Sequence, residues 1–226
     1  MLKDKIAVIT GGGRGLGRVI ALACAREGAD LVLASRSVEA LQETRAEVES
    51  FGRKALVVPT DIRHEDSVRT PAEWEETFAV NVTGAYLCCR AFLPSMIERR
   101  SGSILFISSM TGKRPLFGRT PYAAGKLALV GLARTLAWET GPYGIRVNVI
   151  SPGPIEGERV ERVIRNQAQA EGISEDEARR RFTSSSPLGR LVPPGDIADA
   201  VVFLASDKAA SITGEDLNVS AGTVMY

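Results

Sequence analysis

Tyr122 and Lys126 are the residues whose types and spacing point most directly to chemistry. Thr120 is expected as the N-cap of a helix with Pro121 in its first position, so the tyrosine and the lysine would lie four residues apart on one helix face. An ammonium beside a phenol favours the phenolate, and such a phenol can exchange the proton that accompanies hydride transfer. Tyrosine packing and a solvated lysine also explain the pair when it is taken alone.

A glycine-rich segment, TGGGRGLG at residues 10–17, follows an apolar run and precedes an amphipathic one. Gly11, Gly15 and Gly17 have the spacing G-x-x-x-G-x-G. Between a strand and a helix that begins at Leu16, such glycines let backbone N–H groups and the helix N-terminus meet a pyrophosphate. The sequence therefore predicts a dinucleotide-binding loop, with a tight turn lacking any ligand as the alternative.

The residues after the second expected strand indicate which dinucleotide is bound. An acidic side chain about 20 residues beyond the glycine loop would bind a ribose 2′-hydroxyl. This chain has Ser35 and Arg36 there, so no carboxylate repels a 2′-phosphate, and Arg36 with Arg14 could hold that phosphate between two guanidinium groups. We expect NADP(H), with NAD(H) as the alternative cofactor and a solvated surface as the other interpretation of both arginines.

Short β-branched runs alternate with helical patterns along the chain, which is typical of a parallel sheet covered by helices on both faces. The sequence predicts an α/β fold with a doubly wound parallel sheet of the Rossmann type, in a single domain over residues 1–226. A polar segment, 156–186, interrupts the rhythm after a strand end and is expected to form a substrate lid, with Ser174 and Glu177 as the capping box of a short helix. Strands are expected at 6–10, 31–34, 55–58, 103–108, 146–150 and 217–219, and helices at 16–26, 38–50 and 121–139.

The composition argues against several function classes. A net charge of +1 offers no overall field toward nucleic acid or anionic membranes. Three cysteines without CxxC spacing and the single histidine, His64, provide neither a disulfide framework nor a zinc site. The N-terminus is charged where a signal peptide would be apolar, and no run of about 18 apolar residues occurs. We expect a soluble cytoplasmic protein with reduced thiols and no metal, nucleic-acid or membrane partner.

Over nearly its whole length the sequence resembles the short-chain dehydrogenase/reductase family. The motifs TGGGRGLG, TDI, NVTG, ILFISS, YAAGK and RVNVISPGPI occur in the family's order. The resemblance implies an NADP(H)-dependent enzyme that moves a hydride between nicotinamide and a small carbonyl or alcohol, and a homo-oligomer, either a dimer or a homotetramer. It also implies that Tyr122 is the general acid/base, that Lys126 binds the nicotinamide ribose and that Ser109 hydrogen-bonds the substrate oxygen.

Further site residues follow from the same resemblance. Asp61 and Ile62 would contact the adenine, although Asp61 is also a common turn former. Asn81 would hold a water beside Lys126 and complete a proton relay, or else bond to the backbone inside its helix. The nicotinamide would be lined by Pro152, Gly153 and Ile155.

Two adjacent serines, Ser108 and Ser109, end one of the expected strands and would point to opposite faces. Ser109 stands thirteen residues before Tyr122, and this spacing between serine and tyrosine matches the family. The spacing from Ser108 does not match it. The alternative role for either serine is to bond to loop backbone groups.

The segment between Asp61 and Asn81 is too short for the fold that the resemblance implies. Nineteen residues intervene, whereas a helix, a strand and the start of another helix need roughly 35 to 40. The family's fourth strand and its Asn-Asn-Ala-Gly turn are absent, so we expect a central strand to be missing near residues 69–70. Either the molecule contains a segment that this sequence omits, or the chain is a deletion variant. We favour omission, because each buried backbone group left unpaired costs about 1–3 kcal/mol.

Two other functions stay open on the sequence alone. A Rossmann domain does not by itself imply catalysis, so the chain could be a regulator that senses NADP(H) without turnover. The apolar surface expected on helices near residues 86–97 and 127–138 could instead make it a structural module that pairs with copies of itself. Ser109, Tyr122 and Lys126 together favour an enzyme over both.

Overall fold

The computed structural model describes residues 1–61, 72–116 and 119–225. Its strands are β1 (Ile6–Thr10), β2 (Asp30–Ser35), β3 (Ala55–Pro59), β4 (Gly102–Ile107), β5 (Ile145–Pro152) and β6 (Asp216–Val219). Its helices are α1 (Gly15–Arg26), α2 (Val38–Ser50), α3 (Ala72–Phe78), α4 (Gly84–Arg99), α5 (Thr120–Thr140), α6 (Glu158–Glu171), α7 (Glu175–Thr183) and α8 (Pro194–Ala205). No helix in the described ranges is both long and apolar enough to cross a membrane.

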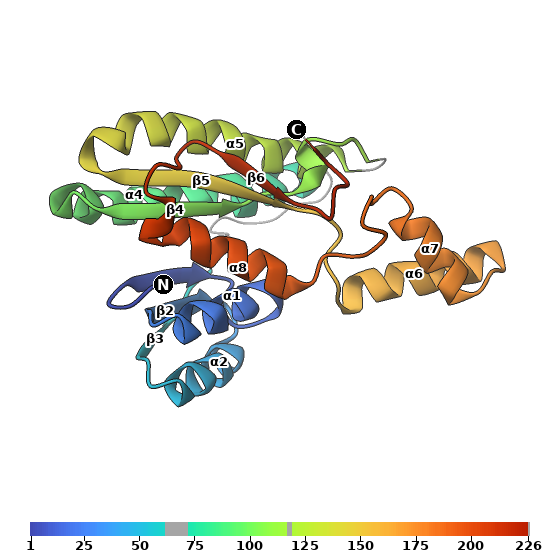
Figure 1. Ribbon diagram of the computed structural model, residues 1–226, viewed down its shortest axis with the longest axis horizontal. Helices are drawn as coiled ribbons and strands as arrows, with labels where there is room; N and C mark the ends of the chain where they lie inside the picture. The colour runs from blue at the N-terminus through green and yellow to red at the C-terminus, as the bar shows by residue number, and fades with distance from the viewer. Residues whose placement is uncertain (62–71, 117–118, 226) are drawn as a thin grey trace.

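The strands form two parallel sheets instead of one continuous sheet. β1, β2 and β3 pair in that order, and β4, β5 and β6 form the second sheet. α1 and α2 pack on the first sheet, α4 and α5 pack on the second, and α8 contacts both α1 and the second sheet (Figure 1). The architecture is the expected Rossmann-like α/β arrangement, divided at its centre.

The second sheet is covered on both faces, and its middle strand shows the consequence. Every residue of β5 except Arg146 is buried. Val147 and Val149 belong to the cluster that includes α5, whereas Ile150 belongs to the cluster that includes α8. A strand with helices on both sides is largely apolar on both sides, which is why a buried strand is expected at residues 146–150.

The gap between the sheets lies between β1 and β4. Each of these strands has a hydrogen-bonded partner on one side only, and no strand within the described ranges lies between them. One face of β1 is bare as well, because Ile6 and Val8 are 73% and 39% exposed while Ala7 and Ile9 pack against the core. The expectation that a central strand is missing is confirmed for the part of the chain that the structure describes.

The expected lid segment, 156–186, forms a helical pair that projects from the body of the protein (Figure 1). α6 and α7 share a small core of Ile164, Ala168 and Ala178. Ser174 is the N-cap of α7, and its hydroxyl accepts from the Glu177 backbone N–H at 3.2 Å, which confirms the Ser174 half of the predicted capping box; the Glu177 carboxylate accepts from Arg180 and Arg181. That this pair acts as a lid stays a prediction.

Candidate functional site

The loop between β1 and α1 has the backbone geometry that a phosphate requires. Gly11 and Gly15 have φ values of 71° and 53°, a region that other residues adopt only with strain. A Cβ on Gly17 would overlap the Gly11 carbonyl. The N-cap of α1, Arg14, makes no side-chain cap and the first turn holds no acidic residue, so the amides at the positive end of the helix are suited to an anion.

The end of β2 lies against this loop, because Gly11 N donates to Ala34 O at 2.7 Å. Ser35 ends β2 and Arg36 follows it into solvent. Arg14 and Arg36 are both exposed, and neither forms an ion pair with another described residue. Arg14 is the N-cap of α1 and Arg36 directly follows β2; that the two guanidinium groups hold one phosphate stays a prediction.

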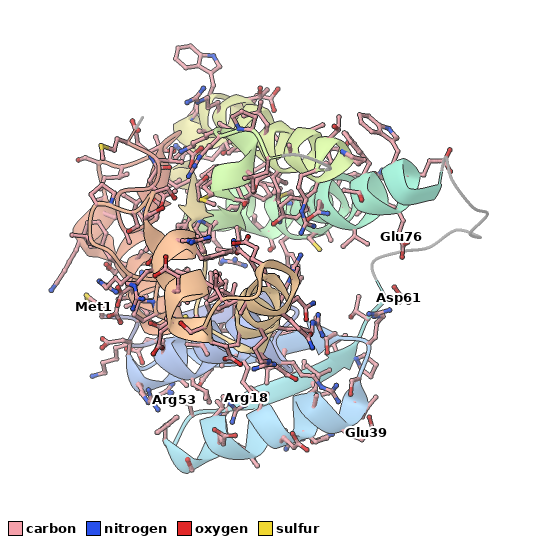
Figure 2. The ribbon with its side chains drawn as sticks, turned by 90° about the vertical axis from the view of Figure 1, so that its right-hand side faces the viewer. Met1, Arg18, Glu39, Arg53, Asp61 and Glu76 are labelled. Atoms are coloured by element: carbon pink, nitrogen blue, oxygen red, sulfur yellow. The ribbon has the colours of Figure 1, made fainter. Side chains whose placement is uncertain are left out.

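Asp61 lies just beyond the end of β3, exposed on the flank of the molecule that also carries Glu76 (Figure 2). Its position at the carboxyl end of a parallel strand is where ligands of α/β sheets bind. Ile62, the second residue expected near the adenine, lies outside the described residues.

Tyr122 lies in the first turn of α5, as expected. The helix begins at Thr120 and its N-cap is Arg119, so the prediction that Thr120 is the N-cap was wrong by one residue. The i,i+4 spacing brings Lys126 Nζ to 5.7 Å from the centroid of the Tyr122 ring. Both side chains are partly buried.

Lys126 is held against the end of β4 by two hydrogen bonds. Its Nζ donates to Ile107 O at 2.9 Å, and its own carbonyl accepts from Ser108 Oγ at 2.7 Å. Burial lowers the pKa of the Lys126 ammonium to about 8. The end of β4 and the first turns of α5 therefore form one unit that carries both serines, the tyrosine and the lysine.

The two serines at the end of β4 have different environments. Ser108 is buried and its hydroxyl is committed to α5. Ser109 is the N-cap of a short 3₁₀ turn, Met110–Gly112, where its partly buried hydroxyl accepts from Thr111 N at 3.2 Å. Ser109 Oγ also donates to Thr111 Oγ1 at 3.2 Å, so the hydroxyls of both serines make local bonds, the alternative role that the sequence left open; that Ser109 binds a substrate oxygen stays a prediction.

Asn81 lies in a π-helical turn, Ala79–Thr83, between α3 and α4. Its Cβ is 3.8 Å from the position that a Cβ on Gly125 would occupy, so Asn81 packs against α5 at Gly125. Gly125 lies between Tyr122 and Lys126 in the sequence. Asn81 Nδ2 donates to Thr77 O at 2.9 Å, which is the backbone bond that the sequence left open as an alternative. The structure thus brings Asn81 to the helix that carries the tyrosine and the lysine.

The residues expected around the nicotinamide form a fixed segment at the end of β5 and just beyond it. Gly153 N donates to Val219 O at 2.9 Å, and a Cβ on Gly153 would lie 2.8 Å from Ser220 Cα. Pro152 is buried, and Ile155 forms a β-bridge with Val192. The segment is therefore clamped between the end of β6 and residues near 192.

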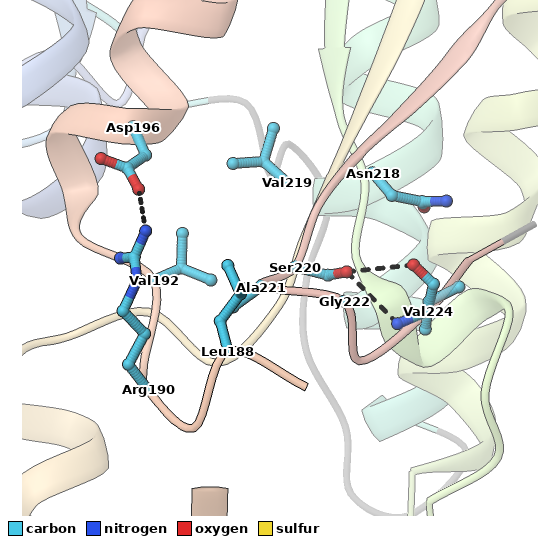
Figure 3. A pocket seen from close by; sticks show the side chains of 10 residues that line it. All are labelled: Leu188, Arg190, Val192, Asp196, Asn218, Val219, Ser220, Ala221, Gly222 and Val224. Atoms are coloured by element: carbon cyan, nitrogen blue, oxygen red, sulfur yellow. Dashed lines mark hydrogen bonds and ion pairs between the residues drawn. The ribbon is translucent and has the colours of Figure 1, made fainter. Parts of the chain in front are cut away.

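A cavity of about 340 Å³ adjoins this segment (Figure 3). Among its lining residues are Val192 and Ser220, and Arg190 and Asp196 form an ion pair of 3.2 Å at its edge. No residue predicted for catalysis lines it. Neither Arg190 nor Asp196 could be singled out from the sequence, because their contact spans the start of α8 and follows no helical or strand spacing.

Within the described ranges, the cysteine and carboxylate side chains form no second reactive or metal-binding site. Cys24 and Cys89 are buried, and burial raises the pKa of each thiol to about 11, so both stay protonated at neutral pH. No cluster of three or more histidine, cysteine or carboxylate side chains that could hold a metal occurs there.

Lys126→Met should stabilise the cofactor-free protein at pH 7, because it removes a buried charge. A fall in pKa from 10.5 to about 8 corresponds to about 3 kcal/mol at most, less the lost bond to Ile107. Between pH 8 and 10.5 the folded lysine binds fewer protons than the unfolded one, so wild-type stability should rise there and the advantage of the variant should shrink. Urea unfolding at pH 7 and pH 10 measures both effects, and a variant that is less stable by the same amount at both pH values would contradict this prediction.

Two family models match the chain, and their matches overlap at residues 68–73. The model described as short chain dehydrogenase matches residues 5–73, and the model described as enoyl-(acyl carrier protein) reductase matches residues 68–224. Together they span the glycine loop, the serine and tyrosine cluster and the end of β6.

A 2-keto-3-deoxy-L-fuconate dehydrogenase of Xanthomonas campestris pv. campestris is 34% identical over 249 aligned positions, which cover 98% of this chain and 80% of the relative. The alignment is longer than the 226 residues of this chain, so the relative has residues where this chain has none. That length difference agrees with a missing internal segment.

Two crystal structures are similar to this fold along its whole length. L-sorbose reductase from Gluconobacter frateurii, complexed with NADPH and L-sorbose, is 26% identical, with a TM-score of 0.91 over 100% of this chain and 98% of that one. An NAD+-bound xylitol dehydrogenase is 25% identical, with a TM-score of 0.88 over 98% of this chain and 99% of that one.

Proposed function

Because the chain belongs to the short-chain dehydrogenase/reductase family of oxidoreductases, we propose that it moves a hydride between NADP(H) and a carbonyl or alcohol through Ser109, Tyr122 and Lys126. The observation that carries this proposal is the docking of the end of β4 on α5. The hydrogen bonds of 2.9 Å and 2.7 Å at Lys126 hold the strand end that bears Ser109 beside the helix turn that bears Tyr122.

Each of the three side chains has a distinct role in this proposal. Bound nicotinamide supplies or takes the hydride. The Ser109 hydroxyl donates a hydrogen bond to the substrate oxygen, and Tyr122 gives its proton to that oxygen during reduction and takes one during oxidation. The Lys126 ammonium binds the cofactor ribose and favours the phenolate.

Asn81 and the helical pair have supporting roles. Asn81 holds a water on the α5 side, through which Lys126 exchanges a proton with solvent. Pro152, Gly153 and Ile155 line the nicotinamide, and α6 with α7 closes over the substrate. Asp61 contacts the adenine at the end of β3.

The choice of NADP(H) depends on Arg14 and Arg36, because the similar crystal structures include one with NADPH and one with NAD+. Arg36→Asp should weaken NADPH binding strongly and spare or improve NADH binding, since the new carboxylate repels a 2′-phosphate and accepts from a 2′-hydroxyl. Fluorescence titration with both cofactors measures this, and Arg53→Asp, at the start of β3, controls for the change of charge. Equal affinity of the wild-type protein for both cofactors would contradict the assignment.

A carbonyl panel with NADPH tests the activity. Oxidation of NADPH in the presence of one or more carbonyls is the expected result. Enhanced NADPH fluorescence without oxidation by any carbonyl or reduction by any alcohol would instead favour a non-catalytic sensor, and no binding at all would favour a structural module.

We also propose that the enzyme is a homodimer or homotetramer built on α4 and α5. Tyr86 and Leu87 on α4 and Leu127 on α5 are about half exposed, and Trp138 near the end of α5 is 88% exposed. Exposed apolar patches on a protein surface often mark contacts between subunits. Analytical ultracentrifugation gives the oligomeric state directly.

A further inference from the structure

A buried ion pair outside the catalytic set joins the turn after Ser109 to the last strand. Lys113 Nζ lies 2.9 Å from Asp216 Oδ2, and the two side chains are only 11% and 5% exposed. The Ser151 hydroxyl donates to Asp216 Oδ1 at 2.6 Å, and Lys113 also donates to Asn218 Oδ1. Replacing a buried ion pair by apolar residues of similar volume is often neutral or stabilising, so a buried pair is weak evidence for a stabilising role alone.

The turn that contains Ser109 is held from two sides. On the α5 side, Gly112 lies so close that a Cβ there would be 3.2 Å from Leu127 N. On the β6 side, the pair that Lys113 forms with Asp216 is the one ion pair among the described residues that links the turn to the strand. Within the turn, Gly112 N donates to Ser109 O at 3.2 Å and Lys113 N donates to Met110 O at 2.9 Å, so a displacement of Lys113 moves the backbone of Ser109.

We propose that Lys113 and Asp216 are a positioning pair, which fixes the Ser109 hydroxyl relative to Tyr122 by tying the turn to β6. This inference rests on the role proposed above for Ser109. A hydroxyl that orients a substrate oxygen must be held to about 0.5 Å, and an ion pair to β6, which is hydrogen-bonded to the buried strand β5, supplies a rigid reference point. The pair carries no net charge, so it acts through geometry and not through the field at the reacting oxygen.

The test removes both charges together in a K113M/D216N variant, so that no unpaired charge is left buried and Ser151 keeps an acceptor. The pair is removed in the wild-type background and in the S109A background, and kcat, KM, NADPH affinity and Tm are measured in all four proteins. In the wild-type background kcat should fall about tenfold or more with NADPH affinity unchanged. In the S109A background the same change should lower kcat by no more than about twofold, because the group that it positions is gone.

A purely structural role would give a different result: the same fold loss of kcat in both backgrounds, in step with Tm. That outcome would overturn the inference. If S109A alone keeps the wild-type kcat, the proposed role of Ser109 is wrong instead, so the two failures are distinguishable.

Two further variants keep the test decisive. R53M/D30N removes the pair between Arg53 and Asp30, 2.7 Å long at the amino end of β2, and should leave kcat unchanged while lowering Tm. K113R keeps both charges and leaves the Asp216 carboxylate a cationic partner but changes the shape of the cation, so it serves as the test if K113M/D216N does not fold. It should lower kcat in the presence of Ser109 and leave kcat unchanged in its absence; an unchanged kcat in both backgrounds would overturn the inference.

Discussion

Tyr122→Phe should lose about 10²–10⁴-fold in kcat while it keeps the affinity for NADPH, because the ring stays in place and only the transferable proton is removed. The side chain is partly buried in the first turn of α5, where phenylalanine occupies the same space. Steady-state oxidation of NADPH by the best carbonyl of the panel gives kcat, and fluorescence titration gives the affinity.

A matched control is available at the other end of α5. Tyr143 is 38% exposed and contacts Arg100, far along the chain from the serine and lysine, so Tyr143→Phe should keep the wild-type rate. A folded, NADPH-bound Tyr122→Phe enzyme that turns substrate over at the wild-type rate would remove the tyrosine from the mechanism and reopen the sensor interpretation.

Filling the gap between β1 and β4 should produce the second large effect. A chimera that carries, between residues 61 and 72, the segment of the Xanthomonas relative that this chain lacks should unfold with a free energy higher by about 3 kcal/mol or more. The inserted strand would pair two open edges, where each buried backbone group left unpaired costs about 1–3 kcal/mol, and would lie beside the exposed Ile6 and Val8.

Urea unfolding measures this change in free energy. The slope of the unfolding free energy against urea concentration should also rise, because the chimera buries more surface on folding. An insert of the same length and composition that is scrambled and contains two prolines is the control, since proline cannot donate to the sheet. Equal stability of the two chimeras would show that no strand is accepted there. An intact mass above 24.2 kDa for the natural protein would show that it already contains the segment.

The parts of the fold that obey local rules could be predicted from the sequence. The glycine loop requires positive φ at Gly11 and Gly15, and the face shared by Tyr122 and Lys126 follows from helical spacing alone. The missing strand could also be predicted, because the length of chain between Asp61 and Asn81 is a property of the sequence itself.

Contacts between distant segments could not be predicted in this way. Lys113 and Asp216 are separated by most of the second half of the chain, and neither residue stands in a motif with recognisable spacing. The different environments of Ser108 and Ser109 depend on how β4 meets α5, which the alternation of side chains predicts only as opposite faces. The N-cap at Arg119 differs from the expected Thr120 because helix ends vary by a residue or two.

Because the sheet is divided, a cofactor bound as proposed would stabilise the folded state by joining the two sheets. Its adenine and phosphate half would contact the first sheet, at Gly11 and Arg36, while its nicotinamide half would contact the second, at Lys126 and Pro152. A dinucleotide bound in this way is a cross-link between two units that share no backbone hydrogen bond at β1 and β4. Cofactor at a concentration a hundred times its dissociation constant would add about 2.7 kcal/mol to the free energy of unfolding. The chain would therefore be most stable where NADPH is abundant.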